Sequence, residues 1–206
     1  MLRFAVLTSL LLFAATVAQA GKYNATLNIG DAAPAWVDLE GTDGKQHALK
    51  DLAGKDVVVV VFISNSCDVA TAYEDRILNF SKKFAGPAGK VGLVAINVNT
   101  IAEDRLDKMK ARAEAKAFDF EYLYDPSQKI GKAYGAAFTP EFFVLDRQRQ
   151  VVYMGGMDDS SQPSEVKQNF LDPAVEAALA GKSPATAEAP AIGCRIRYAR
   201  ERRSKE

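Results

Sequence analysis

Hydrophobic residues along the chain alternate between continuous β-branched runs and patterns with helical spacing. The run DVVVVVFI at 56–63 is almost wholly apolar, which is typical of a strand buried on both faces of a sheet. After Cys67 the period changes and predicts an amphipathic helix that ends near Phe84. The residues at helical spacing are Val69, Tyr73, Ile77, Phe80 and Phe84.

The same two patterns predict the other elements of one α/β domain. A tight hairpin is expected around the turn at 42–44, ahead of the first long run. Further strands are expected at 91–99, 120–125, 139–146 and 151–156, the last two antiparallel. Helices are expected at 101–117, 126–135 and 163–182, with a kink or break at Pro173. This order predicts a central mixed β-sheet with helices on both faces and an N-terminal β-hairpin extension.

The two ends of the chain differ from this domain in composition. Residues 1–20 have a basic start, an apolar centre and the cleavage pattern Ala-Gln-Ala, which predicts a cleaved secretory signal peptide and a periplasmic or secreted protein. A membrane anchor is the alternative. Residues 21–182 form the predicted domain. Residues 183–206 are expected to be an extended Pro/Ala linker and a basic tail, in which the alternation at 192–198 could add a strand.

Charge and residue counts exclude several classes of function. Lys plus Arg and Asp plus Glu each number 26, so the balance predicts neither a nucleic-acid partner nor a charged membrane footprint. No integral membrane segment is expected after signal cleavage. One histidine and two distant cysteines give no metal-ligand spacing, and no glycine-rich phosphate loop is present. We therefore expect no metal and no cofactor, and we interpret His47 as a surface residue.

Cys67 stands where a thiol can be activated, between a buried strand and a helix. Amide groups and the dipole at a helix N-terminus favour the thiolate and lower the pKa of a thiol. Asp68 acts in the opposite direction, because a nearby carboxylate disfavours the thiolate. Asn65 or Ser66 is expected to cap the helix. The sign of the net pKa shift stays open.

These features resemble the thioredoxin fold, and within it the redoxins of the alkyl hydroperoxide reductase/thiol-specific antioxidant superfamily. The resemblance is carried by the order of elements, by the cysteine after the first long strand and by Thr-Pro at the third strand, and it covers 29–198. It implies a thiol oxidoreductase with antioxidant activity, acting on protein thiols, disulfides or peroxide with an unknown reductant. The matching segments are GDAAPAWVDLEGTDGKQHALKDLAGKDVVVVVF, NSCDVATAYEDR, TPEFFVLD, VVYMGGMDD and IGCRIRY.

The chain departs from the usual Cys-x-x-Cys motif of the family. By position, the attacking cysteine is Ser64 and the resolving cysteine is Cys67, so a dithiol cycle within 64–67 is excluded. In the peroxiredoxin pattern Cys67 is the peroxidatic cysteine and Ser64 the hydroxyl residue. The proline of that pattern is Val60 here, and its arginine has no clear counterpart. The resemblance further implies that Thr139 and Pro140, joined by a cis peptide bond, line a substrate groove.

Three interpretations of Cys194 remain open at this stage. It resolves an oxidised Cys67, it forms a permanent bridge with Cys67, or it is structural while Cys67 is an inert buried thiol. Two functions follow: an enzyme that uses the single active-site cysteine Cys67, assisted by a hydrogen bond from Ser64, or a binding module that has lost turnover. Arg76 could favour an anion near Cys67 or pair with a helix neighbour. The carboxylates read as caps and turn residues are Asp125, Asp146, Asp158 and Asp159.

Overall fold

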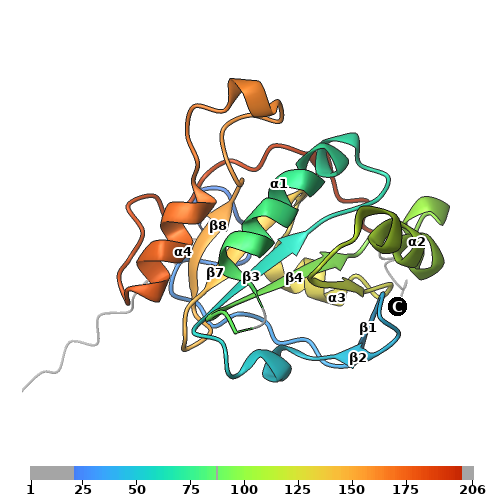
Figure 1. The fold of residues 1–206 in the computed structure, drawn as a ribbon, viewed down its shortest axis with the longest axis horizontal. Helices are drawn as coiled ribbons and strands as arrows, with labels where there is room; N and C mark the ends of the chain where they lie inside the picture. Colours follow the sequence, from blue (N-terminus) through green and yellow to red (C-terminus); the bar gives the residue numbers. More distant parts are fainter. Residues whose placement is uncertain (1–20, 87, 201–206) are drawn as a thin grey trace, which may run out of the picture.

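The computed structural model describes residues 21–86 and 88–200, which form one α/β domain (Figure 1). The predicted signal peptide at 1–20 lies outside the described residues. The strands are β1 Leu39–Gly41, β2 Gln46–His47, β3 Val57–Phe62, β4 Val91–Asn97, β5 Glu121–Tyr124, β6 Phe138–Thr139, β7 Glu141–Leu145, β8 Val151–Gly155 and β9 Cys194–Arg195. The helices are α1 Asp68–Phe84, α2 Leu106–Lys116, α3 Lys129–Tyr134 and α4 Leu171–Leu179, with short 3-10 helices η1 Leu49–Leu52, η2 Ala102–Asp104 and η3 Pro163–Glu165.

A central mixed sheet has the strand order β2-β1-β5-β4-β3-β7-β8. The strands β3, β4 and β5 are parallel, and β7 and β8 are antiparallel to their neighbours. The pair β1–β2 is the predicted N-terminal hairpin. The prediction of a mixed sheet with a hairpin extension is therefore confirmed.

The β-branched run of β3 is apolar throughout because both faces of the sheet are covered. Val57, Val59 and Val61 pack with α1 and α4, whereas Val58, Val60 and Phe62 pack with Tyr134 of α3 and with the N-terminal segment. Figure 1 shows α1 and α4 on one side of the sheet. All six residues of β3 are fully buried.

The closing helix is shorter than predicted. The expected helix at 163–182 is replaced by η3, an extended stretch and α4, which begins only at Leu171. Pro173 does not kink a helix, because it lies in the first turn, where its missing N–H would have no helical partner. The carboxylate of Asp159 accepts hydrogen bonds from the amides of Lys167 and Gln168 and holds the stretch extended. The predicted helix at 101–117 is likewise divided, into η2 and α2.

The C-terminal segment is packed against the domain. Its backbone lies beside β8, where the amide of Met154 donates to Ala187 (3.1 Å) and that of Ala189 donates back to Met154 (3.2 Å). It then passes the N-terminal end of α1, as the red trace in Figure 1 shows, and β9 pairs with β6 in a separate small sheet. Ile196 is buried in the core. The strand expected within 192–198 is thus present, with two residues.

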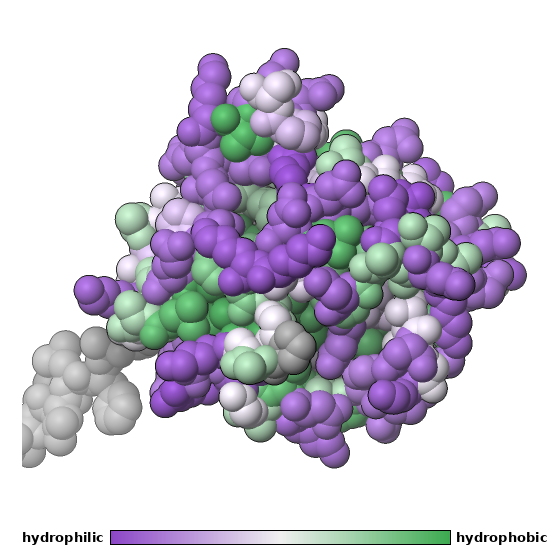
Figure 2. All heavy atoms as spheres, in the orientation of Figure 1, coloured by the Kyte–Doolittle hydropathy of each residue, from purple (hydrophilic) through white to green (hydrophobic). Residues whose placement is uncertain are grey.

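Figure 2 shows that hydrophilic residues predominate on the face seen in Figure 1, with hydrophobic residues in patches between them. Within residues 21–86 and 88–200, no helix is long and apolar enough to cross a bilayer.

Candidate active site

Cys67 is buried at the junction of β3 and α1, with 1% of its surface exposed. It is itself the N-cap of α1, since its sulfur accepts a hydrogen bond from the amide of Ala70 at 3.2 Å. The prediction that Asn65 or Ser66 caps this helix is wrong. The Asn65 side chain contacts the Glu103 carbonyl and the Tyr122 hydroxyl, and the Ser66 hydroxyl donates to Asp104. The Ala70 N–H is one of the amides at the start of α1 that have no partner within the helix.

The carbonyl of Thr139 faces the same sulfur. The Cys67 thiol donates a hydrogen bond to this oxygen across 3.0 Å. A carbonyl oxygen only accepts, so the Cys67 thiol is the donor in this contact. The Thr139–Pro140 peptide bond is cis, as the resemblance implies. Thr139 and Pro140 therefore lie beside the cysteine loop.

Cys194 reaches Cys67 through the pairing of β9 with β6. In this antiparallel register Cys194 lies directly opposite Thr139, whose carbonyl already contacts Cys67. Both cysteines are free thiols. Together with Ser64 they line a cavity of about 340 Å³. Cysteines that are 127 residues apart in the sequence are thus brought to one site.

The surroundings of Cys194 disfavour its thiolate. Burial raises the pKa of the Cys194 thiol, and the interaction with the neighbouring Cys67 raises it further. The amide of Val69 lowers this pKa, and the carboxylate of Asp68 raises it. Asp68 thus acts on the Cys194 thiol in the direction expected of a nearby carboxylate.

Gly193 allows β9 to approach β6 this closely. A Cβ atom at this position would lie 2.6 Å from the carbonyl carbon of Thr139 and closer still to its oxygen. Real Cβ atoms do not come this near to backbone atoms. The glycine before Cys194 is therefore what permits the register that brings the two thiols together.

The Ser64 hydroxyl belongs to a buried polar network centred on Asp104. It donates to the Asp104 carboxylate (3.2 Å) and accepts from the side-chain amide of Asn99 (3.0 Å). Asp104 has no exposed surface and also accepts from the amides of Asn65 and Ser66, the Ser66 hydroxyl and the Asn97 side chain. These bonds hold the loop 64–67 in place. The Ser64 hydroxyl thus has a structural role at the position of the family's attacking cysteine.

Asn99 joins this network to the C-terminal segment. Its side-chain amide donates to Ser64, and its carbonyl oxygen accepts from the amide of Arg197 at 3.1 Å. The segments that carry Cys67 and Cys194 are therefore tied to one residue. Sequence reasoning missed Asn97, Asn99 and Asp104. The signal for the first two was present, since amides that end an apolar strand need buried partners.

Comparison with known proteins agrees with this fold. The Redoxin family matches residues 28–169. The chain belongs to the Redoxin family. A hypothetical protein of Sinorhizobium meliloti 1021 is 35% identical, with 85% of this chain and 97% of that chain covered and a TM-score of 0.77.

Two further structures are similar to this redoxin. An uncharacterized conserved protein from Geobacillus kaustophilus is 32% identical (TM-score 0.78), with 85% of this chain and 94% of that chain covered. A putative thiol:disulfide interchange protein DsbE from Chlorobium tepidum is 23% identical (TM-score 0.60), with 74% of this chain and 99% of that chain covered, and shows the fold alone. Among curated proteins, none matches the chain. The chain is thus a thioredoxin-fold redoxin.

The other charged residues singled out in the sequence stabilise the redoxin fold. Arg76 forms an ion pair with Asp158 at 2.6 Å, and stacks on the ring of Tyr73, so neither predicted partner of Arg76 is the one observed. Asp158 is thus a buried ion-pair partner in addition to a turn residue. Asp125, Asp146 and Asp159 accept from backbone amides of their own turns or neighbouring stretches, as predicted.

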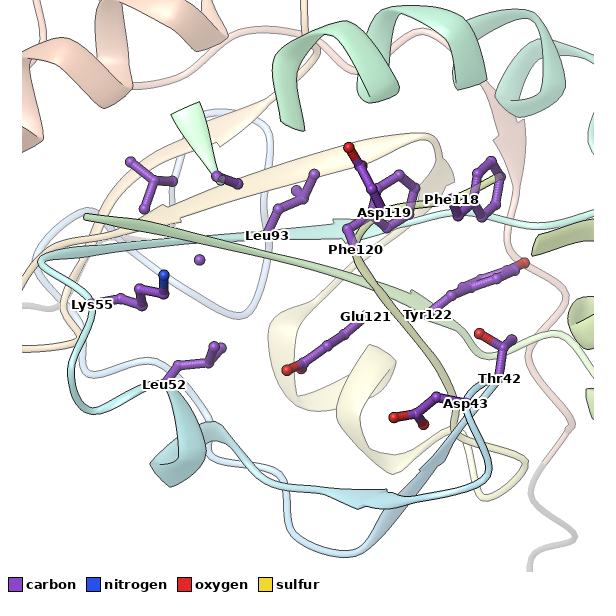
Figure 3. Close-up of a pocket in the computed structure, with 13 residues that line it drawn as sticks. Thr42, Asp43, Leu52, Lys55, Leu93, Phe118, Asp119, Phe120, Glu121 and Tyr122 are labelled. Atoms are coloured by element: carbon purple, nitrogen blue, oxygen red, sulfur yellow. The ribbon is translucent and has the colours of Figure 1, made fainter. Parts of the chain in front are cut away.

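His47 contacts two of the residues, Asp43 and Glu121, that line a second cavity of about 310 Å³ (Figure 3). Its ring contacts Asp43 (2.9 Å) and Glu121 (3.5 Å), and its side chain is 13% exposed, so it is more buried than expected. Burial raises the pKa of Glu121. Among the described residues, no group of three or more potential ligands could hold a metal ion.

Replacing Asp68 with asparagine is expected to lower the pKa of Cys194, because it removes a nearby negative charge that disfavours the thiolate. Cys67 and Asp68 act on the Cys194 thiol, and Arg195 and Arg197 line the same cavity. The measurement is the pH dependence of Cys194 alkylation by iodoacetamide, followed by peptide mass. Asp75→Asn, which removes an exposed charge farther along α1, is the control and is expected to leave the profile unchanged.

Proposed function

We propose that this redoxin is an exported thiol oxidoreductase in which Cys67 and Cys194 cycle between a dithiol and a disulfide. The observation that carries the proposal is the β6–β9 register, which sets Cys194 opposite Thr139 while the Thr139 carbonyl contacts Cys67. Export is supported by the composition of residues 1–20 alone.

The cycle balances with either a disulfide or a peroxide as the oxidant. With a disulfide, two exchange steps release two external thiols and form the Cys67–Cys194 bond. With a peroxide, the Cys67 thiolate displaces water or an alcohol and becomes a sulfenic acid. The Cys194 thiol then condenses with this sulfenic acid, and water leaves. A thiol reductant restores the dithiol.

The alternative of a binding module without turnover finds less support. A partner strand would need the backbone of Thr139 and its neighbours, but β9 pairs with β6 there, and the amide of Ile196 donates to Ala137 at 2.9 Å. The groove is therefore filled by the chain's own segment. That segment also carries a thiol, which an inert scaffold would not need at this position.

A non-reducing peptide mass map of the protein, taken before and after a brief peroxide pulse, tests the proposal. The expected result is two free thiols at the start and a Cys67–Cys194 disulfide afterwards, reversed by dithiothreitol. The Cys67→Ser variant should lose turnover of peroxide and of disulfides. A wild-type map in which both thiols persist, or in which a bridge present from the start resists dithiothreitol in the folded protein, would contradict the proposal.

A further inference from the structure

We infer that Cys194 is the thiol that exchanges with external disulfides, that Cys67 is the inner thiol that resolves them, and that the preferred substrates are small disulfides bearing negative charge. The inference rests on the proposed redox pair of Cys67 and Cys194. It reverses the role that the peroxiredoxin pattern implies for Cys67, which is that of the attacking cysteine.

Accessibility separates the two thiols. Cys67 exposes 1% of its surface, with contacts to Ala70 and to Thr139 on either side, whereas Cys194 is partly exposed. Rates of thiol–disulfide exchange depend on access to the sulfur. An external disulfide, which is bulkier than a peroxide, therefore meets Cys194 before it meets Cys67.

The motif position supports the same order. In disulfide reductases of this fold the first cysteine of the motif attacks and the second resolves; here the first is Ser64, whose hydroxyl is held by Asp104 and Asn99. Cys67 keeps the position of the resolving cysteine. Cys194, brought to Cys67 by β9, supplies the thiol that the motif lacks.

The chemistry of reduction also places the external sulfur on Cys194. An external thiolate attacks the Cys194 sulfur of the Cys67–Cys194 disulfide, a new bond forms at Cys194, and Cys67 leaves with the electron pair. The leaving Cys67 thiolate accepts a hydrogen bond from the Ala70 N–H at the start of α1. Once protonated, it donates to the Thr139 carbonyl. A second external thiolate then attacks the external sulfur of the mixed disulfide. Cys194 leaves as a thiolate and takes up a proton, and one external disulfide is the product.

In the oxidising direction the same steps run backwards. The Cys194 thiolate attacks the external disulfide, one external thiolate leaves, and a mixed disulfide forms at Cys194. The Cys67 thiolate then attacks the Cys194 sulfur and releases the second external thiolate. One external disulfide is reduced to two thiols, and the protein dithiol is oxidised.

Charge at the cavity favours anionic reactants. Arg195 and Arg197 are exposed, and both line the cavity that holds the two thiols. Asp68 opposes them with a single exposed carboxylate, while the charge of Asp104 is buried among the donors of the loop. The cavity of about 340 Å³ suits a small molecule, and β9 already fills the strand-pairing site on β6. Small disulfides with carboxylate groups fit both the positive charge of the two arginines and the size of the cavity.

The test uses Cys67→Ser and Cys194→Ser variants of the full chain, reduced and then exposed to oxidised glutathione, an anionic disulfide. Both substitutions preserve side-chain size, and circular dichroism and thermal melting establish that each variant is folded. The expected result is a glutathione adduct on Cys194 in Cys67→Ser, formed at least about tenfold faster than any adduct on Cys67 in Cys194→Ser. A faster adduct on Cys67 overturns the order of the two thiols.

The charge preference is tested in the Cys67→Ser background with Arg195→Gln and Arg197→Gln together. The adduct rate is expected to fall about threefold to tenfold with oxidised glutathione and to rise with cystamine, a cationic disulfide. Arg200→Gln, on the same exposed segment but outside the cavity lining, is the matched control. Equal rates for the two disulfides in all variants overturn the preference. Failure of the wild type to form a Cys67–Cys194 disulfide would instead overturn the proposed function.

Discussion

Replacing Gly193 with alanine is expected to slow formation of the Cys67–Cys194 disulfide by about a hundredfold, because misplacement by about 1 Å has an effect of this size on a reaction between positioned groups. The new Cβ atom would lie 2.6 Å from the carbonyl carbon of Thr139, so β9 must move away from β6. Cys194 is the next residue and moves with it. The measurement is the fraction of disulfide against time after addition of oxidised glutathione, by non-reducing peptide mass.

Gly54→Ala is a chemically identical control, since a Cβ atom at Gly54 meets no atom within 4 Å. It is expected to form the disulfide at the wild-type rate. Thermal melting should show that both variants fold, because β6–β9 is a small sheet separate from the central one. If Gly193→Ala oxidised as fast as Gly54→Ala, the β6–β9 register would not be what positions the thiols.

The main sheet could be predicted from the sequence because its strands depend on local pattern and burial. The apolar run of β3 has only one physical explanation in a domain of this size, a strand covered on both faces. The closing helix was predicted too long because its start depends on a contact outside the segment rather than on local pattern. Residues 166–170 have no strong local preference against a helix, and the extended path depends on the carboxylate of Asp159, which lies outside the segment.

The candidate site could be predicted only in part. Cys67 follows from its place between a strand and a helix, and Thr139 and Pro140 follow from the resemblance. The meeting of Cys194 with Cys67 depends on a register between segments that are distant in the sequence, and no local pattern specifies it. Asp104 lies near the start of the helix expected at 101–117, where an acidic residue needs no further explanation, but its carboxylate accepts hydrogen bonds from a loop 40 residues away.

Replacing Asp104 with alanine is expected to lower the free energy of unfolding by about 3–5 kcal/mol, because several buried donors lose their acceptor at once. The amides of Asn65 and Ser66 and the side-chain amide of Asn97 all donate to the same carboxylate oxygen. With their acceptor gone, the loop before Cys67 is no longer held. Urea denaturation followed by circular dichroism measures the loss, and disulfide formation should slow in the same variant.

Asp104→Asn separates the role of the charge from that of the acceptor. The retained amide oxygen can serve the three N–H donors, and the new amide nitrogen can donate to the hydroxyls of Ser64 and Ser66, which rotate to accept. The expected loss is about 1 kcal/mol, with the loop and the disulfide rate largely preserved. Equal and large losses in both variants would mean that the negative charge itself stabilises the loop. A negligible loss in Asp104→Ala would contradict the account of Asp104 as the residue that positions Cys67.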